Sequence, residues 1–93
     1  MRGVKHITCP MERRVNDALE QAGVMFVHES QDNKATNGLD FYLPHLNLYI
    51  EVKQFHTDRI AEQMSRVDNV IAVQGEYAVN AFCALLRGRE LKA

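Results

Sequence analysis

Apolar residues recur at helical spacing directly after the first proline of the chain. Proline is favoured in the first turn of a helix, so the pattern predicts a helix that begins at Pro10. Gly23 is of the type that commonly follows a helix end, and it predicts where this helix stops. The expected buried stripe contains residues three and four apart, together with one neighbour: Met11, Val15, Ala18, Ala22 and Leu19.

The middle of the chain alternates short apolar runs with polar segments. Residues 24–27, 39–43 and 48–52 are rich in strand-forming types, which predicts three strands. The polar stretch 30–38 predicts a loop between the first two. The uninterrupted apolar stretch 69–73 predicts a fourth strand, buried on both faces and paired in parallel.

Two further helices complete the pattern. Thr57 or Asp58 is a candidate cap for a second helix, and Gly88 is a candidate stop for a third. The second helix has the apolar stripe Ile60, Ala61, Met64 and Val67, and the third has Ala78, Val79, Phe82, Leu85 and Leu86. The predicted order is α-β-β-β-α-β-α, an α/β fold with a mixed four-stranded sheet flanked by helices.

The second and third strands predict a hairpin with a defined register. A turn centred on residues 44–47 places three apolar pairs on one face: Leu43 with Leu48, Phe41 with Ile50, and Leu39 with Val52. The other face then pairs Tyr42 with Tyr49, Asp40 with Glu51, and Gly38 with Lys53. A slip of one residue would mix the two sets, so the register is well specified. We expect the two tyrosines to pack under the first helix.

The acidic pair on the second face indicates chemistry. Asp40 and Glu51 would lie about 4.5–5.5 Å apart at their Cβ atoms, where two like charges are destabilising unless something compensates. A magnesium ion compensates, since it takes oxygen ligands from carboxylates, water and phosphate. Lys53 projects from the same face, about 6.5–7 Å along the strand, where it can stabilise charge that develops on a phosphate. The alternative is an ordinary solvent-facing strand surface with a chance Glu-x-Lys.

These residues resemble the signature of the PD-(D/E)xK nucleases. A strand carries Gly38-Leu39-Asp40, a turn follows, and the next strand carries Glu51-Val52-Lys53, with Leu39 in place of the family's proline. The resemblance covers roughly residues 10–73. It implies a restriction-endonuclease-like three-layer fold and a cofactor of Mg²⁺ or Mn²⁺, held by Asp40, Glu51 and the backbone carbonyl of Val52. By the same resemblance, Glu12 is a further catalytic acid on the first helix and Gln63 an auxiliary residue on the second.

Composition narrows the function. The 93 residues fit a single domain, with a core at about 10–73 and a C-terminal helix at about 77–87. Since the net charge is −1, any DNA contact must use locally concentrated cations, and the candidates are Arg13, Arg14, Lys34 and Arg59. Two separated cysteines without C-x-x-C spacing argue against zinc. No histidine pair has ligand spacing on a helix; the four are His6, His28, His45 and His56.

The expected function is metal-dependent endonucleolytic hydrolysis of DNA phosphodiester bonds, as in small junction resolvases and phage or DNA-repair nucleases. Little chain lies outside the core, so we expect recognition of DNA structure rather than of a long sequence. A homodimer would add stability and place two sites on two strands. No signal peptide or membrane span is evident, so we expect a cytoplasmic protein with no membrane partner. The alternative is a catalytically inactive nuclease-fold module for DNA binding or assembly.

Overall fold

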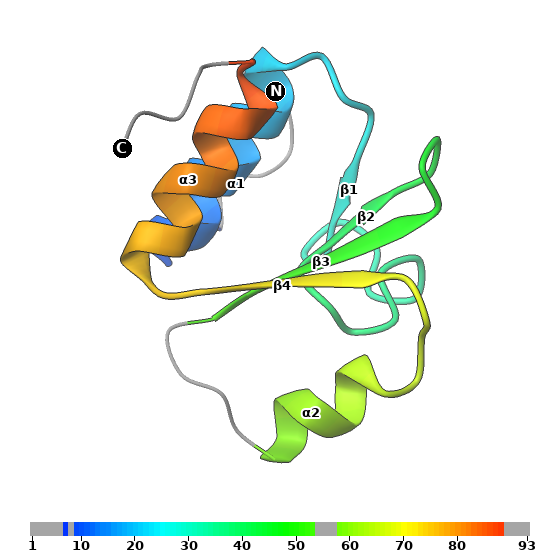
Figure 1. The fold of residues 1–93 in the computed structure, drawn as a ribbon. Coiled ribbons are helices and arrows are strands. Elements are labelled where there is room, and N and C mark those ends of the chain that lie inside the picture. The colour runs from blue at the N-terminus through cyan, green and yellow to red at the C-terminus, as the bar shows by residue number, and fades with distance from the viewer. Residues whose placement is uncertain (1–6, 8, 54–57, 89–93) are drawn as a thin grey trace.

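The computed structural model describes residues 7, 9–53 and 58–88. The elements follow one another in the predicted order, which confirms an α/β fold with a mixed four-stranded sheet. Figure 1 shows helices α1 and α3 together on one side of the sheet, with α2 apart from them beyond β4. The elements are α1 (Pro10–Gln21), β1 (Val27–His28), β2 (Phe41–Leu43), β3 (Leu48–Lys53), α2 (Asp58–Met64), β4 (Val70–Gln74) and α3 (Glu76–Leu86).

Helix α1 begins at Pro10 and ends before Gly23, as predicted. Gly23 has φ of 73°, a left-handed conformation that glycine adopts without steric cost. Ala22 is exposed, so its predicted place in the buried stripe is wrong. The reason is that Ala22 is the C-cap residue, where the chain already turns away from the core. The residues of the stripe that are buried are Met11, Val15, Ala18 and Leu19.

The hairpin has the predicted register over its central pairs. Phe41 lies opposite Ile50, Tyr42 opposite Tyr49, and Leu43 opposite Leu48. Strand β2 is shorter than the predicted 39–43, because the ladder ends at Phe41. The expected pairs of Asp40 with Glu51, Leu39 with Val52 and Gly38 with Lys53 are therefore absent from the described ladder, and Asp40 meets Glu51 through a side-chain hydrogen bond instead. Gly38 has φ of 77°, which turns the chain away from the extended path just before β2.

The first strand begins later than predicted. The amide of Val24 donates to the carbonyl of Leu19 at 3.1 Å, so this segment still completes the end of α1. Met25 is 60% exposed, and β1 contains only Val27 and His28. His28 lies opposite Phe41 in an antiparallel pair. Strand β1 therefore starts later than the predicted strand and extends one residue past its predicted end.

Strand β4 pairs with β3 in parallel, as predicted, but it is not buried on both faces. The strand order is β1-β2-β3-β4, so β4 is an edge, and Ile71 is 38% exposed. Val73 alone of the strand is buried. Helix α2 leaves Ala61 exposed, which contradicts its place in the predicted stripe. Thr57 lies outside the described residues, as do the side chains of Asp58 and Ile60.

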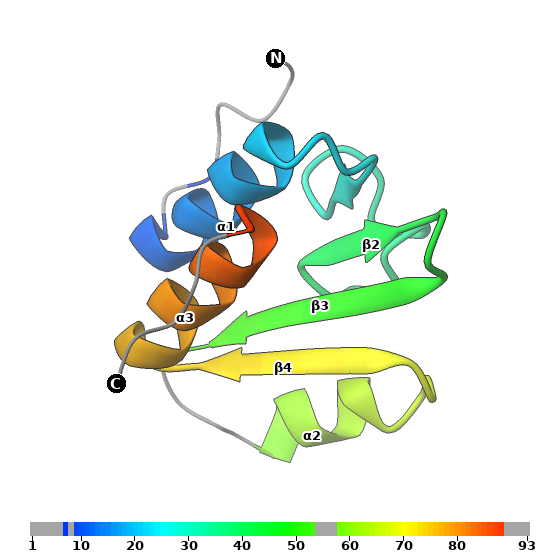
Figure 2. The same cartoon turned by 45° about the horizontal axis from the view of Figure 1, so that its top comes forward.

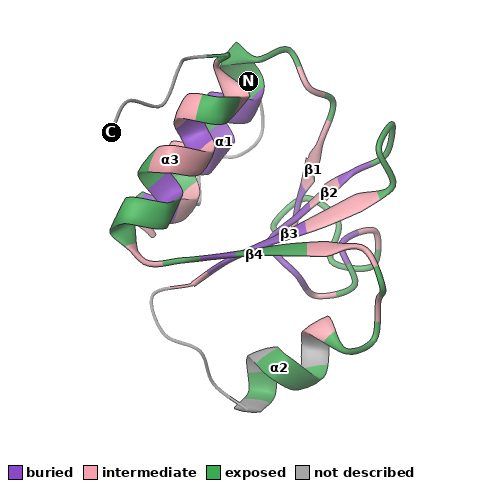
Figure 3. Cartoon of the chain, in the orientation of Figure 1, coloured by how far each residue is buried: buried purple, intermediate pink, exposed green. Residues whose placement is uncertain are grey.

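The core lies where α1 and α3 meet the sheet. Figure 2 shows the two helices side by side, and Figure 3 shows buried residues gathered along them and the adjoining strands. From α3, Val79 and Cys83 are buried, whereas Ala78 and Leu85 face solvent, contrary to the predicted stripe. The sheet contributes Phe41, Leu43, Ile50, Val52 and Val73.

The tyrosine pair lies on the opposite face of the hairpin, so its expected place under α1 is wrong. Side-chain alternation separates the pair from Phe41 and Ile50, which pack against the helices. The rings of Tyr42 and Tyr49 have centroids 4.6 Å apart. Tyr42 donates to Oδ1 of Asn47 at 2.9 Å, and Tyr49 accepts from Nδ2 of Asn37 at 2.8 Å. No helix in the described part of the chain is both long enough and apolar enough to cross a membrane.

Candidate functional site

Asp40 and Glu51 meet where the ladder between β2 and β3 ends. Oε1 of Glu51 accepts from the Asp40 amide at 3.1 Å, and Oδ2 of Asp40 accepts from the Val52 amide at 2.7 Å. Just beyond the last ladder pair, the two carboxylates thus take the place of backbone carbonyls as acceptors for the amides of Asp40 and Val52. The residues are only 3% and 2% exposed, respectively. The structure therefore brings together the acidic pair that the register predicted.

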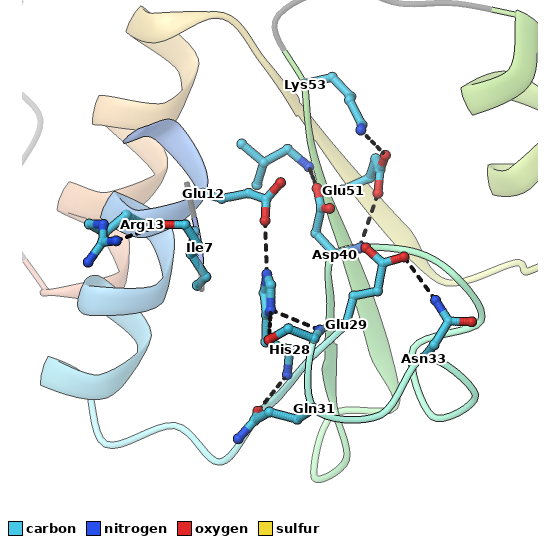
Figure 4. Close-up of polar contacts among 12 residues, drawn as sticks. Ile7, Glu12, Arg13, His28, Glu29, Gln31, Asn33, Asp40, Glu51 and Lys53 are labelled. Atoms are coloured by element: carbon cyan, nitrogen blue, oxygen red, sulfur yellow. Dashed lines mark hydrogen bonds and ion pairs between the residues drawn. The ribbon is translucent and has the colours of Figure 1, made fainter. Parts of the chain in front are cut away.

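Lys53 completes this arrangement. Its Nζ lies 3.3 Å from Oε2 of Glu51, and its side chain is partly exposed. Figure 4 shows the ammonium at the outer end of the cluster, beyond the buried carboxylates. Lys53 consequently lies between the buried charge and solvent.

Burial dominates the electrostatics of the acidic pair. It raises the pKa of Asp40 from 3.8 to about 8, with further increases from the nearby charges of Glu12 and Glu51. Burial also raises the pKa of Glu51, although Lys53 opposes that shift. For Lys53, burial lowers the pKa, but the carboxylates of Glu51 and Asp40 outweigh it and the net shift is upward. Asp40 is therefore protonated at neutral pH unless a cation compensates its charge.

Glu12 reaches the cluster from α1. Its Oε1 lies 2.8 Å from Nε2 of His28, and Figure 4 shows its side chain directed toward the strands that carry Asp40 and Glu51. The effect of Glu12 on the pKa of Asp40 is consistent with this position. The structure thus brings Glu12 together with the predicted pair.

His28 was not predicted as a site residue. It is 5% exposed, and its Nδ1 accepts from the Ser30 amide at 3.1 Å. An accepting Nδ1 leaves the proton on Nε2, which then donates to Glu12. The relevant sequence signal is the extension of the first strand to His28, which lies opposite Phe41, the residue that follows Asp40.

The Val52 carbonyl is directed to the same side as the Asp40 carboxylate. The Val52 amide donates to Asp40, and the amide and carbonyl of one strand residue point to the same side of the strand. The carbonyl of the next residue, Lys53, points the other way and accepts from Gly75 at 2.9 Å. Val52 is therefore placed to offer an oxygen beside Asp40.

The potential ligands are not preassembled into a closed metal cage. Among the described residues, no three His, Cys, Asp or Glu side chains already form a group that could hold a metal ion. The Asp40 and Glu51 oxygens are instead engaged with backbone amides and Lys53. Gln63 belongs to α2, but its side chain lies outside the described ones, so its predicted auxiliary role stays a prediction.

The four predicted DNA-binding cations fall into two groups. Arg14 donates to Oδ1 of Asn80 at 2.8 Å and lies 3.4 Å from a Glu76 oxygen, and Arg13 donates to the Ile7 carbonyl at 2.6 Å. Both arginines thus bind within the helical layer or to the segment before α1. Lys34 and Arg59 instead line one surface hollow. The structure brings together only this second group.

Comparison of the chain with protein-family models, with curated proteins and with solved structures finds no match.

Proposed function

We propose that the protein is a divalent-metal-dependent endonuclease that hydrolyses DNA phosphodiester bonds. The observation that carries this proposal is the burial of Asp40 and Glu51 side by side, with Lys53 at the solvent end. Burying carboxylates costs stability unless their charge is compensated. The ammonium of Lys53 is a single positive charge beside three carboxylates, those of Asp40, Glu51 and Glu12. Negative charge therefore remains that a bound cation would neutralise.

The residues present fit a magnesium or manganese ion. The donors are all oxygens, namely the carboxylates of Asp40 and Glu51 and the Val52 carbonyl, and this is the ligand type that Mg²⁺ and Mn²⁺ prefer. When bound, such an ion polarises a phosphate and lowers the pKa of a coordinated water. Binding requires ionised carboxylates, so the raised pKa of Asp40 makes metal affinity dependent on pH.

The remaining residues orient and stabilise. Lys53 stabilises negative charge on the phosphate in the transition state, because its ammonium lies at the open side of the carboxylates. Glu12 adds a third acidic group from α1, and the His28 ring fixes the direction of its carboxylate. The hydrogen bond from Val52 holds Asp40 in place.

We also propose that the fold is the restriction-endonuclease-like one. The mixed sheet, the order of its elements and the position of the acidic pair on the central strands support this assignment. A homodimer acting on two strands fits a domain of this size.

The test is a panel of supercoiled plasmid, branched, flapped and single-stranded DNA with Mg²⁺ or Mn²⁺. We expect cleavage of at least one substrate by the wild type, and loss of cleavage in Asp40→Asn and Glu51→Gln. Arg14→Ala is the matched control, because it removes a charge from the helical layer. Metal binding by calorimetry separates the alternatives. If the protein neither binds metal nor cleaves any of these DNAs, the result would favour an inactive DNA-binding or assembly module.

A further inference from the structure

A surface hollow lies beside the candidate site and has no part in the proposed chemistry. It has a volume of about 450 Å³, within the roughly 300–1,000 Å³ of small-molecule sites. One wall comes from the segment between β1 and β2, and the other comes from α2 and the turn after it. We call this the basic hollow; its lining residues are Glu29, Asn33, Lys34, Asn37, Gly38, Arg59 and Arg66.

The charge of the basic hollow is opposite to that of the whole chain. Three cations, Lys34, Arg59 and Arg66, face one carboxylate, a formal excess of two positive charges. The chain as a whole carries −1, so this is a local concentration of positive charge. Within the described part of the chain, none of the three cations forms an ion pair.

The one carboxylate of the hollow already has a partner. Oε2 of Glu29 accepts from Nδ2 of Asn33 at 2.9 Å. Glu29 therefore bonds to a neutral amide and leaves the lysine and the two arginines to interact with an incoming anion. Such cations are the usual partners of phosphate oxygens.

The basic hollow adjoins the carboxylate cluster. The Glu29 amide donates to the Asp40 carbonyl at 2.9 Å, and Gly38 precedes Asp40 by two residues. Figure 4 shows Glu29 and Asn33 beside Asp40. If a DNA strand placed one phosphate at Asp40 and Glu51, a neighbouring phosphate of the same strand would therefore lie at the basic hollow.

We infer that the basic hollow binds the phosphodiester backbone of the DNA strand that is cut, at a phosphate next to the scissile one. This inference rests on the proposed function, which places the scissile phosphate at the carboxylates. The excess of positive charge in the hollow and its place beside the Asp40 segment favour a strand that continues from the carboxylates over a free anion.

The test measures DNA binding without metal. Wild type, Lys34→Ala, Arg66→Ala and Arg14→Ala are titrated in EDTA against a labelled duplex and its single strand, with fluorescence anisotropy as the readout. We expect Lys34→Ala and Arg66→Ala each to weaken binding roughly fivefold, the upper end for an exposed ion pair. Each should also reduce the salt slope by about one. Arg66→Lys keeps the charge and should keep most of the affinity.

The control removes an equal charge elsewhere. Arg14 is held by Asn80 and Glu76, so Arg14→Ala should change the affinity less than about twofold. An equal loss in Arg14→Ala would mean general charge attraction and would overturn the inference. The inference would also be overturned if Lys34→Ala and Arg66→Ala bound DNA like the wild type, or if the wild type bound neither the duplex nor the single strand.

A second arm distinguishes a strand from free phosphate. Inorganic phosphate is titrated against the wild type and Arg66→Ala by calorimetry. If Arg66→Ala weakened the binding of inorganic phosphate but not the binding of DNA, the assignment of the hollow to a DNA strand would be overturned. Because EDTA prevents metal-dependent cleavage, these results are independent of the catalytic proposal. If the hollow variants lose DNA affinity but no condition yields cleavage, the hollow is supported and the endonuclease proposal fails.

Discussion

The two faces of the β2–β3 hairpin hold opposite kinds of buried side chain. On one face Phe41 and Ile50 are fully buried, packed beneath α1 and α3. On the other, Asp40 and Glu51 are 3% and 2% exposed. Burying a large apolar side chain stabilises a fold by about 1.5–3 kcal/mol. Burying a carboxylate costs free energy unless it is neutralised or paired.

The difference teaches that burial alone does not indicate a structural role. The apolar face supports the fold, whereas the acidic face lowers its stability when both carboxylates are ionised. Its hydrogen bonds to backbone amides offset part of that penalty and hold the carboxylates in place. Substitutions on the two faces should therefore separate stability from function.

The largest expected effect lies on the apolar face. Phe41→Ala should lower the free energy of unfolding by about 3–5 kcal/mol, because it removes a fully buried ring from the core. Urea denaturation measures this change. Glu51→Gln, on the other face, retains an acceptor for the Asp40 amide and removes a buried charge, so its loss of stability should be much smaller. Equal losses in the two variants would remove the distinction between the faces.

The next effect lies on the acidic face and concerns activity. Lys53→Met should slow DNA cleavage by about 10²–10³-fold, since it removes the cation that stabilises charge on the phosphate. Initial rates of plasmid nicking measure it, and Arg14→Met serves as the control in the helical layer. Metal affinity, measured by calorimetry, should be largely retained. Cleavage at the wild-type rate would exclude the proposed role of Lys53.

The sequence predicted the apolar face well because alternation and register are local properties. Once the turn was placed, Phe41 and Ile50 had to share a face, and Asp40 and Glu51 had to lie beyond them on the other. The end of α1 was equally local, because Gly23 marks it. The acidic pair was predictable for the same reason as the core.

What could not be predicted depends on tertiary packing. An apolar run such as Val70–Gln74 looks the same at an edge as inside a sheet, and only the strand order makes β4 an edge. The contact between Glu12 and His28 joins α1 to β1 across 16 positions in the chain, so no local spacing indicates it. The basic hollow likewise combines Lys34 with Arg59 and Arg66, from segments separated by the hairpin.

The hydrogen bond between Glu12 and His28 links α1 to the sheet beside the acidic face. His28→Phe keeps the ring that packs edge-on to Phe41, at a centroid distance of 5.0 Å, but removes the donor to Glu12. We expect metal affinity to fall about 10–100-fold, because Glu12 would no longer be held with its negative charge beside the metal ligands. Calorimetry with Mn²⁺ measures the change.

The matched control is His28→Gln, whose amide nitrogen can donate to Glu12 as Nε2 does. It should recover most of the metal affinity. If His28 only filled space, His28→Phe would bind metal like the wild type and His28→Gln would gain nothing from its donor. That result would mean that the contact between His28 and Glu12 has no part in metal binding.

A further effect is a pH dependence that the apolar face cannot produce. Because burial and then the charges of Glu12 and Glu51 raise the pKa of Asp40 from 3.8 to about 8, the folded protein keeps a proton that the unfolded chain releases. The stability from this group is complete below about pH 4 and is lost as pH rises through about 8. Its limiting slope is about 1.4 kcal/mol per pH unit.

Urea denaturation of the metal-free protein in EDTA, between pH 5 and pH 9, measures this loss. Asp40→Asn keeps an acceptor for the Val52 amide but cannot ionise, so its stability should vary less with pH. Addition of Mg²⁺ or Mn²⁺ should stabilise the wild type more strongly as pH rises, since the carboxylates must be deprotonated to act as ligands. Identical pH profiles for the wild type and Asp40→Asn would show that Asp40 is ionised throughout, and that its burial does not impose the penalty that distinguishes the two faces.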